Sequence, residues 1–243
     1  MHKFFKHALG QLCIAGMLTG VASAATDIQK LNDRIDAATA VIHELMATPD
    51  KGVPQWVAAK AKCVAVVPGY KKGAFVVGGQ YGQGLATCRT AHGWSAPVFM
   101  QITGASFGFQ AGGQSTDLVL VGTNHKSMQD MMKEKVKLGG DAAASAGPVG
   151  RNSQASISAL ANAEFLTYSR SKGLFAGLDL TGDYINQNKE DTKVFYGKEI
   201  PYAEILSGKV PTPPAAHHFE AAVAHMFHAS QAATKKEAKK EAM

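Results

Sequence analysis

Residues 60–123 carry a pattern of short apolar runs divided by glycine-rich breaks. The runs contain mostly Val, Ile, Leu, Phe and Ala, and the breaks read Pro-Gly, Tyr-Gly-Gln-Gly, His-Gly and Gly-Gly. This pattern is typical of short antiparallel strands. The same chemistry returns at residues 165–177, around a Ser-Lys-Gly turn. We therefore predict an α+β fold whose centre is a curled antiparallel or barrel-like sheet of short, glycine-rich strands.

A helix with one apolar stripe is predicted to precede this sheet. Thr26 and Gln29 are spaced as a capping box, and the helix is expected to run to Met46. The stripe consists of Ile28, Leu31, Ile35, Ala38, Ile42 and Leu45. Such a stripe packs on a sheet or, as an alternative, lies on a membrane surface. Short flanking helices are predicted at residues 53–60, 127–135, 185–196 and 203–207.

The N-terminal sequence is typical of an export signal. Residues 1–7 are basic, residues 8–21 are apolar, and Ala22-Ser23-Ala24 matches an A-x-A cleavage site. We predict a signal peptide over residues 1–24 and a protein of the periplasm or cell envelope, peripheral to the membrane. Residues 25–208 then form the folded domain. Residues 209–243 are predicted to be a proline-rich linker and a solvated, partly disordered tail rich in Ala, His and Lys.

Export changes the charge and the cysteine count. The formal net charge of +6 becomes 23 − 19 = +4 without Lys3 and Lys6, which is too modest to indicate a nucleic-acid partner. Cys63 and Cys88 remain, and two thiols in an oxidising compartment favour a disulfide. It closes a loop of roughly 25 residues, worth about 3 kcal/mol in the chain-entropy model. Because bridged Cα atoms lie within about 7 Å, the two cysteine strands must be neighbours or the sheet must curl sharply.

One short motif is typical of hydrolases, but its context argues against catalysis. Residues 104–108 match G-x-S-x-G around Ser106, and Asp117 and His125 follow in hydrolase order. A nucleophile elbow requires a strand, a sharp turn and a helix, whereas Ser106 lies in an alternating, strand-like run. No motif for a cofactor and no complete set of metal ligands accompanies it. The sequence therefore predicts a protein that is not an enzyme and has no cofactor.

Cationic side chains near the predicted turns are the remaining chemical signal. They are Lys60, Lys62, Lys71 and Lys72 beside the first strand, and Arg151, Arg170 and Lys172 in the later turns. If the turns gather at one end of the sheet, these residues form a basic rim that can hold anionic head groups. Each Lys or Arg near an anionic bilayer adds roughly 1 kcal/mol of binding free energy.

Several runs, taken in order, resemble the SYLF domain, the lipid-binding module also known as the Las17-binding or actin-regulator family. They are residues 71–82, 93–97, 106–112, 147–151 and 168–177. The resemblance covers about residues 57–207. It implies a non-enzymatic α+β domain that binds phosphoinositides or other anionic phospholipids. It also implies a membrane role for the N-terminal helix and for the lysines at 60, 62, 71 and 72.

A signal peptide indicates a bacterial envelope, where neither actin nor phosphoinositides are expected. The predicted partner is therefore an anionic phospholipid or a membrane surface. The alternative is a structural or scaffolding envelope protein that binds a protein partner.

Overall fold

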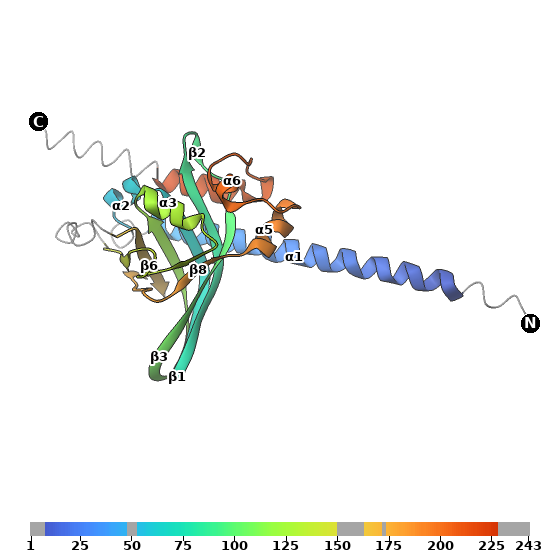
Figure 1. The fold of residues 1–243 in the computed structure, drawn as a ribbon, viewed down its shortest axis with the longest axis horizontal. Helices are drawn as coiled ribbons and strands as arrows, with labels where there is room; N and C mark the ends of the chain where they lie inside the picture. Colours follow the sequence, from blue (N-terminus) through green and yellow to red (C-terminus); the bar gives the residue numbers. More distant parts are fainter. Residues whose placement is uncertain (1–7, 48–52, 150–162, 172–173, 228–243) are drawn as a thin grey trace, which may run out of the picture.

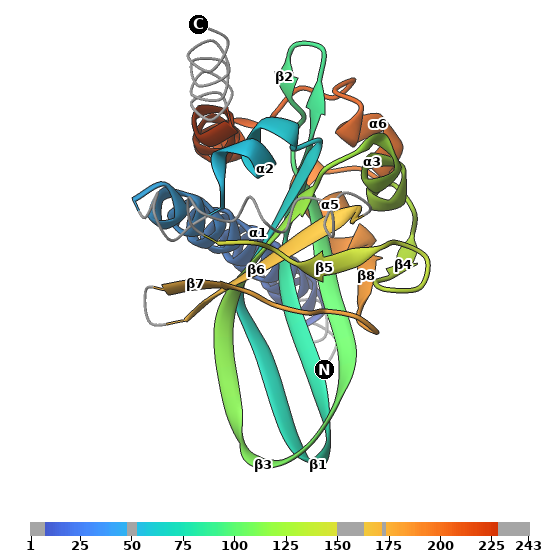
Figure 2. The ribbon, with the colours of Figure 1, turned by 90° about the vertical axis from the view of Figure 1, so that its left-hand side faces the viewer.

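The centre of the fold is a pair of long antiparallel strands, β1 (Cys63–Thr90) and β3 (Val98–Gly122). They pair from Cys63 with Gly122 to Ala86 with Val98. The register shifts just after Ala74, where both strands bend back, as the lower part of Figure 2 shows. Each strand therefore has two arms, and we call this bent pair the folded ribbon. The arms of β1 are residues 63–74 and 76–90.

The other elements are arranged around the folded ribbon (Figure 1). The computed structural model describes residues 8–47, 53–149, 163–171 and 174–227. Its helices are α1 (Ala8–Ala47), α2 (Gln55–Lys60), α3 (His125–Met131), α5 (Lys189–Tyr196), α6 (Tyr202–Leu206), the 3-10 turn η2 (Pro214–Ala216) and a helical segment at 217–227. Its remaining strands are β2 (Gly93–Trp94), β4 (Lys135–Lys137), β5 (Ala144–Ala146), β6 (Phe165–Ser171), β7 (Leu174–Gly177) and β8 (Tyr184–Gln187).

The short strands extend the ribbon into a curled, eight-stranded sheet. One arm of β3 pairs with β6 over residues 117–122, and the other pairs with β8 over residues 100–103. The parallel strand β5 and the antiparallel strand β7 then pair with β6, and β4 pairs with β8. The predicted α+β class with a curled sheet is confirmed.

The predicted length of the central strands is wrong, because several glycine-rich breaks lie inside strands. A Cβ atom on Gly84 would lie 2.0 Å from the carbonyl oxygen of Val66, and one on Gly82 would lie 2.5 Å from Cγ1 of Val67. These glycines therefore allow the two arms of β1 to approach each other closely. Their local pattern is the same as that of a turn, which explains the error.

Toward its disulfide end, the ribbon is buried on both of its faces. Along the first arm of β1, Val64 and Val66 face the layer that contains α1, while Ala65 and Val67 face the inside of the curled sheet. Because both faces are apolar, the strand reads as a nearly continuous hydrophobic run. The buried side chains on these two faces make up a large part of the hydrophobic core.

Helix α1 packs its apolar stripe against this sheet. Leu31, Ile35 and Ile42 are at most 3% exposed, which confirms the sheet-packing interpretation for the described stripe. The predicted start at Thr26 is wrong, since the helix is continuous from Ala8 and projects well beyond the sheet (Figure 1). The preceding segment contains no proline, so nothing in its backbone interrupts the helix. Among the described residues, no helix is long and apolar enough to span a membrane.

The segment after the proline-rich stretch is part of the core, which differs from the predicted solvated tail. Residues 217–227 are helical, and Phe219, Val223 and Phe227 are completely buried. The ring of Phe227 lies 5.1 Å from that of Trp94, between centroids. The Ala-rich composition suggested solvation, but the apolar side chains recur on one helical face and find a partner surface beside α1. Residues 228–243 lie outside the described part of the chain.

Of the short helices, those predicted at 53–60 and 203–207 are confirmed as α2 and α6. The helix predicted at 127–135 is α3 (His125–Met131), which begins slightly earlier because Asn124 is its N-cap; its predicted end is wrong, since Lys135 begins β4. The helix predicted at 185–196 is partly wrong. Ile185 belongs to β8 and packs in the inner core, and α5 begins only after Asn188, whose side chain accepts a hydrogen bond from the backbone of Asp191 at 3.1 Å.

The predicted disulfide between Cys63 and Cys88 is present. Their Cα atoms are 4.0 Å apart and both residues are fully buried. The two cysteines lie in the two arms of the same strand, so of the two geometries expected, the sharp curl is the one found. The disulfide joins the arms at the end of the ribbon opposite the bend.

Candidate functional site

A cationic cluster lies at the disulfide end of the ribbon. Lys60 ends α2, Lys62 precedes Cys63, and Arg89 follows Cys88. The backbone N–H of Arg89 donates to the carbonyl of Lys62 at 2.7 Å, and its Nε donates to the carbonyl of Ala61 at 3.1 Å. The disulfide thus brings cations from both arms together. We call Lys60, Lys62 and Arg89 the cationic end.

Two tryptophans accompany the cationic end. The ammonium of Lys60 lies 5.6 Å from the ring centre of Trp56, and the guanidinium of Arg89 lies 4.7 Å from that of Trp94. Neither indole N–H donates a hydrogen bond within the described structure, and Nη2 of Arg89 also has no acceptor there. Burial lowers the pKa of Arg89, as expected for a cation with no nearby carboxylate.

The cationic end is a group of three cations without acidic partners that lie close together, whereas other unpaired lysines of the described chain, such as Lys193 and Lys209, are not part of this group. Within that part, no carboxylate lies within 4.0 Å of Lys60, Lys62 or Arg89. The paired cations elsewhere include Arg34 with Asp191 at 2.5 Å, Lys126 with Glu164 at 2.8 Å, Lys133 with Asp130 at 2.5 Å, and Lys189 with Glu134. These pairs connect elements of the fold, whereas the charges of the cationic end are not neutralised.

Arg170, which was also predicted to bind lipid, is one of the paired cations. Its guanidinium contacts Glu44 of α1 and Asp117 of β3, the latter at 2.9 Å. Asp117 also accepts a hydrogen bond from the backbone of Gly69 at 2.9 Å. Arg170 therefore joins α1 to the ribbon. Arg151 and Lys172 lie outside the described residues.

Lys71 and Lys72 are exposed but distant from the cationic end. Nine residues of extended strand separate Lys62 from Lys71, which corresponds to roughly 30 Å. The structure therefore does not bring the four lysines into one rim. Lys72 lines a pocket of about 90 Å³ together with Tyr70, Gln80 and others. That volume is far below the 300–1,000 Å³ or so that is usual for ligand pockets.

A buried carboxyl group lies beside this small pocket. Oδ2 of Asp183 is 2.8 Å from the hydroxyl of Tyr70, which is also 2.6 Å from Oε1 of Gln80. Burial raises the pKa of Asp183 more than the Tyr70 hydrogen bond and the Lys72 charge lower it, and Asp179 raises it further. A Cβ on Gly104 would lie 1.7 Å from Oδ1 of Asp183. Glycine at that position therefore provides the space for the carboxyl group.

The hydroxyl of Tyr70 has one proton but two acceptor neighbours. Both contacts are hydrogen bonds when Asp183 is protonated and donates to Tyr70, which then donates to Gln80. The raised pKa of Asp183 means that burial favours its protonated form more than in water. This group connects both arms of β1 to the segment that precedes β8.

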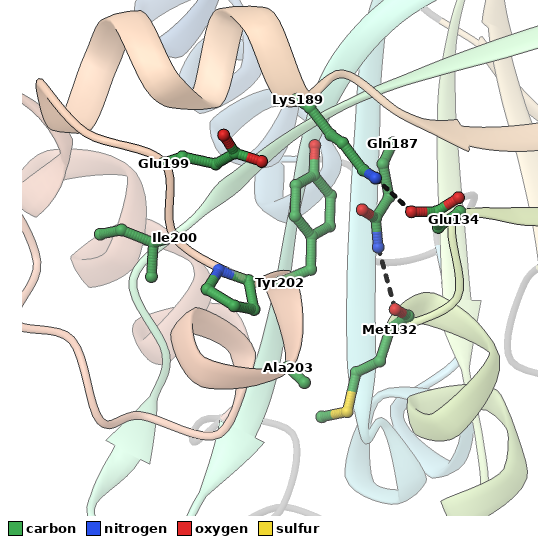
Figure 3. A pocket seen from close by; sticks show the side chains of 9 residues that line it. Met132, Glu134, Gln187, Lys189, Glu199, Ile200, Tyr202 and Ala203 are labelled. Carbon is green, nitrogen blue, oxygen red and sulfur yellow. Dashed lines mark hydrogen bonds and ion pairs between the residues drawn. The ribbon is translucent and has the colours of Figure 1, made fainter.

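A second, larger pocket of about 270 Å³ opens between α3 and the α5–α6 region (Figure 3). It is lined by Met132, Glu134, Gln187, Lys189, Glu199, Ile200, Pro201, Tyr202 and Ala203. Its lining combines apolar side chains with two carboxylates and one ammonium group. Lys60 and Lys62 line neither pocket.

The hydrolase motif has no catalytic geometry. Ser106 pairs with Gly78 inside β3, so the required strand, turn and helix are absent at this described position. His125 begins α3, and Asp117 is occupied by Arg170 and the backbone of Gly69. The arrangement offers cationic and pocket surfaces for binding in place of a nucleophile.

Comparison with known proteins identifies the family. The family model described as Ysc84, Las17-binding protein actin regulator, matches residues 103–226, which is half of the chain. The chain belongs to the Ysc84 family. Members of this family are generally non-catalytic binding domains. The match extends to residue 226, which agrees with the buried helical segment at 217–227.

Curated relatives of the Ysc84 family are similar over about two thirds of this chain. The rat SH3 domain-containing YSC84-like protein 1 is 38% identical over 167 residues, covering 68% of this chain and 49% of the relative. The human protein of the same name is 36% identical over 167 residues, covering 68% and 48%. Protein YSC84 of Saccharomyces cerevisiae is 36% identical over 171 residues, covering 69% and 36%. This chain therefore spans about half or less of the relatives it matches.

Sequence reasoning missed Arg89, Trp56 and Trp94 as members of the cationic end. A signal for Arg89 was available, because it follows Cys88 directly and the predicted disulfide places Cys88 beside Cys63 and hence near Lys62. The two tryptophans gave no such signal, since their positions depend on how α2 and β2 pack.

Proposed function

We propose that this Ysc84-family domain associates peripherally with anionic phospholipid at a membrane surface of the cell envelope, through its cationic end. The observation that carries the proposal is that Lys60, Lys62 and Arg89 lie close together and that, in the described structure, no carboxylate is within 4.0 Å of any of them. Lys60 is exposed and Lys62 is half-buried, so their charges remain available to phosphate groups, while Arg89 is partly buried behind them. The ring of Trp56, which is half-buried beside Lys60, suits the interface, where tryptophan side chains are enriched.

Contact at the head-group level fits this surface better than uptake of an acyl chain. The apolar stripe of α1 is already buried against the sheet, and the cationic residues Lys60 and Lys62 line neither described pocket. The binding free energy then comes mainly from charge, at about 1 kcal/mol for each cation near the surface. Binding is therefore expected to weaken as salt is added.

Vesicle co-sedimentation tests the proposal. The protein is mixed with neutral phosphatidylcholine vesicles and with vesicles that also contain phosphatidylglycerol. We expect binding only to the anionic vesicles. The variant Lys60→Gln/Lys62→Gln removes two charges, or about 2 kcal/mol, which corresponds to a roughly 30-fold loss of affinity.

The matched control is Lys193→Gln/Lys198→Gln, which removes the same charge from two exposed lysines elsewhere. It should lose much less affinity. Equal binding to both vesicle types, no binding at all, or equal losses in the two double variants contradicts the proposal. A parallel variant, Lys71→Gln/Lys72→Gln, measures whether the distant lysines take part.

A further inference from the structure

The pocket between α3 and α5–α6 has an apolar floor and acceptor groups at its edges. Ile200 and Tyr202 are 8% and 4% exposed, and Met132, Pro201 and Ala203 add apolar surface. The hydroxyl of Tyr202 is already used, because it donates to the carbonyl of Phe99 and lies 3.1 Å from Thr192 Oγ1. The floor therefore offers apolar contact and little free hydrogen-bonding capacity.

Two hydrogen-bond acceptors of this pocket have no donor among the described residues. Nε2 of Gln187 donates to the carbonyls of Met132 and Lys133 at 2.9 and 3.1 Å, while its Oε1 accepts nothing from the described residues. Glu199 has no cation within 4.0 Å in the same part of the chain. In Figure 3 the Glu199 carboxylate and the Lys189–Glu134 pair lie on opposite sides of Tyr202.

The charges of the lining sum to −1, although the whole chain is basic. Glu134 and Glu199 each carry one negative charge, and Lys189 carries one positive charge. The ion pair with Lys189 lowers the pKa of Glu134, so that carboxylate stays ionised. A guest that supplies one positive charge and several donors would satisfy both the charge and the idle acceptors.

We propose that this pocket binds a primary alkylammonium group with a short apolar stem. The ammonium would donate to Glu199, and the stem would lie along Met132 and Pro201. A volume of about 270 Å³ admits a group of this size, while drug-sized ligands usually occupy roughly 300–1,000 Å³. The same chemistry is presented by a lysine side chain of a partner protein and by a free diamine. The proposal does not depend on lipid binding.

Calorimetric and NMR titrations of the full chain test the proposal with three probes. The probes are 1,5-diaminopentane, the tripeptide Gly-Lys-Gly and the neutral analogue 1,5-pentanediol. We expect saturable binding of the ammonium probes, with a Kd of millimolar order for ligands of so few atoms, and no binding of the diol. Tighter binding of the peptide indicates a protein partner, and tighter binding of the diamine indicates a free amine.

Three variants make the test specific to the pocket. Glu199→Gln should weaken binding about tenfold or more, because a charged hydrogen-bond partner is lost. Glu204→Gln removes an exposed carboxylate of α6 that does not line the pocket and should leave binding unchanged. Lys189→Met removes a competing ammonium and frees Glu134, so it should strengthen binding, which a misfolded variant cannot do. Binding of the diol with similar affinity, no binding of either ammonium probe, or unchanged affinity in Glu199→Gln overturns the proposal.

Discussion

Removing the disulfide should destabilise the protein by an amount that follows from its place in the ribbon. The bridge joins residues 25 positions apart. In the chain-entropy model a loop of this length contributes about 3 kcal/mol at 25 °C. With a urea m-value of about 2 kcal/mol per molar, the midpoint of unfolding falls by about 1.5 M. The variant that removes the disulfide is Cys63→Ala/Cys88→Ala.

The assay is urea unfolding followed by circular dichroism, with and without a reducing agent. The wild type in reducing buffer is the matched control, because it lacks the bridge in the unfolded state but keeps both sulfur atoms. Its free energy of unfolding should fall to within about 1 kcal/mol of the double variant, the remainder being the cost of two small buried cavities. If the wild type in non-reducing buffer exceeds the double variant by less than about 1 kcal/mol, the loop-closure reasoning is refuted.

Two further predictions concern the C-terminal segment and the buried acid. Phe219→Ala should lower the free energy of unfolding by about 3–5 kcal/mol, because Phe219 is fully buried. The control His217→Ala changes an exposed residue and should lower it by less than about 0.5 kcal/mol. Similarly small losses for both variants in urea unfolding would contradict the packing of this segment. The folded pKa of Asp183 is raised, so the neutral acid contributes stability that is fully present below its ordinary pKa and is lost as pH rises through the folded value. The free energy of unfolding of the wild type should therefore rise relative to Asp183→Asn on acidification from pH 7 to 4, and a constant difference between the two proteins would disprove the assignment.

Local patterns were sufficient for features that depend on a few neighbouring residues. The spacing of Leu31, Ile35 and Ile42 predicted a helix that packs on the sheet, because a stripe of that period has only one face to bury. The two cysteines left after predicted cleavage indicated the bridge. The same pattern on Phe219 and Val223 was available, but an Ala- and Lys-rich composition outweighed it. Periodicity was the better guide to burial there.

Features that depend on the path of the chain in space were not predictable from these patterns. The glycines at 82 and 84 resemble a turn, and only the approach of the two arms shows that they belong to a continuous strand. The buried contact of Asp183 with Tyr70 gave no local signal, because the two residues are 113 positions apart. Likewise, Arg34 lay on the polar side of a predicted amphipathic helix, yet it pairs with Asp191 across 157 positions.

The near-symmetric placement of the cysteines about the reversal in β1 has a consequence for changes in chain length. Phe75 is 12 residues after Cys63 and 13 before Cys88. An added residue rotates every position between it and the reversal onto the opposite surface, since the sulfur–sulfur link holds the other end in place. A residue inserted beside either cysteine therefore turns about a dozen side chains to the wrong face of the sheet, whereas one inserted beside Phe75 turns almost none. Tolerance to insertion is therefore graded along each arm, and the tip is the natural place to graft a loop.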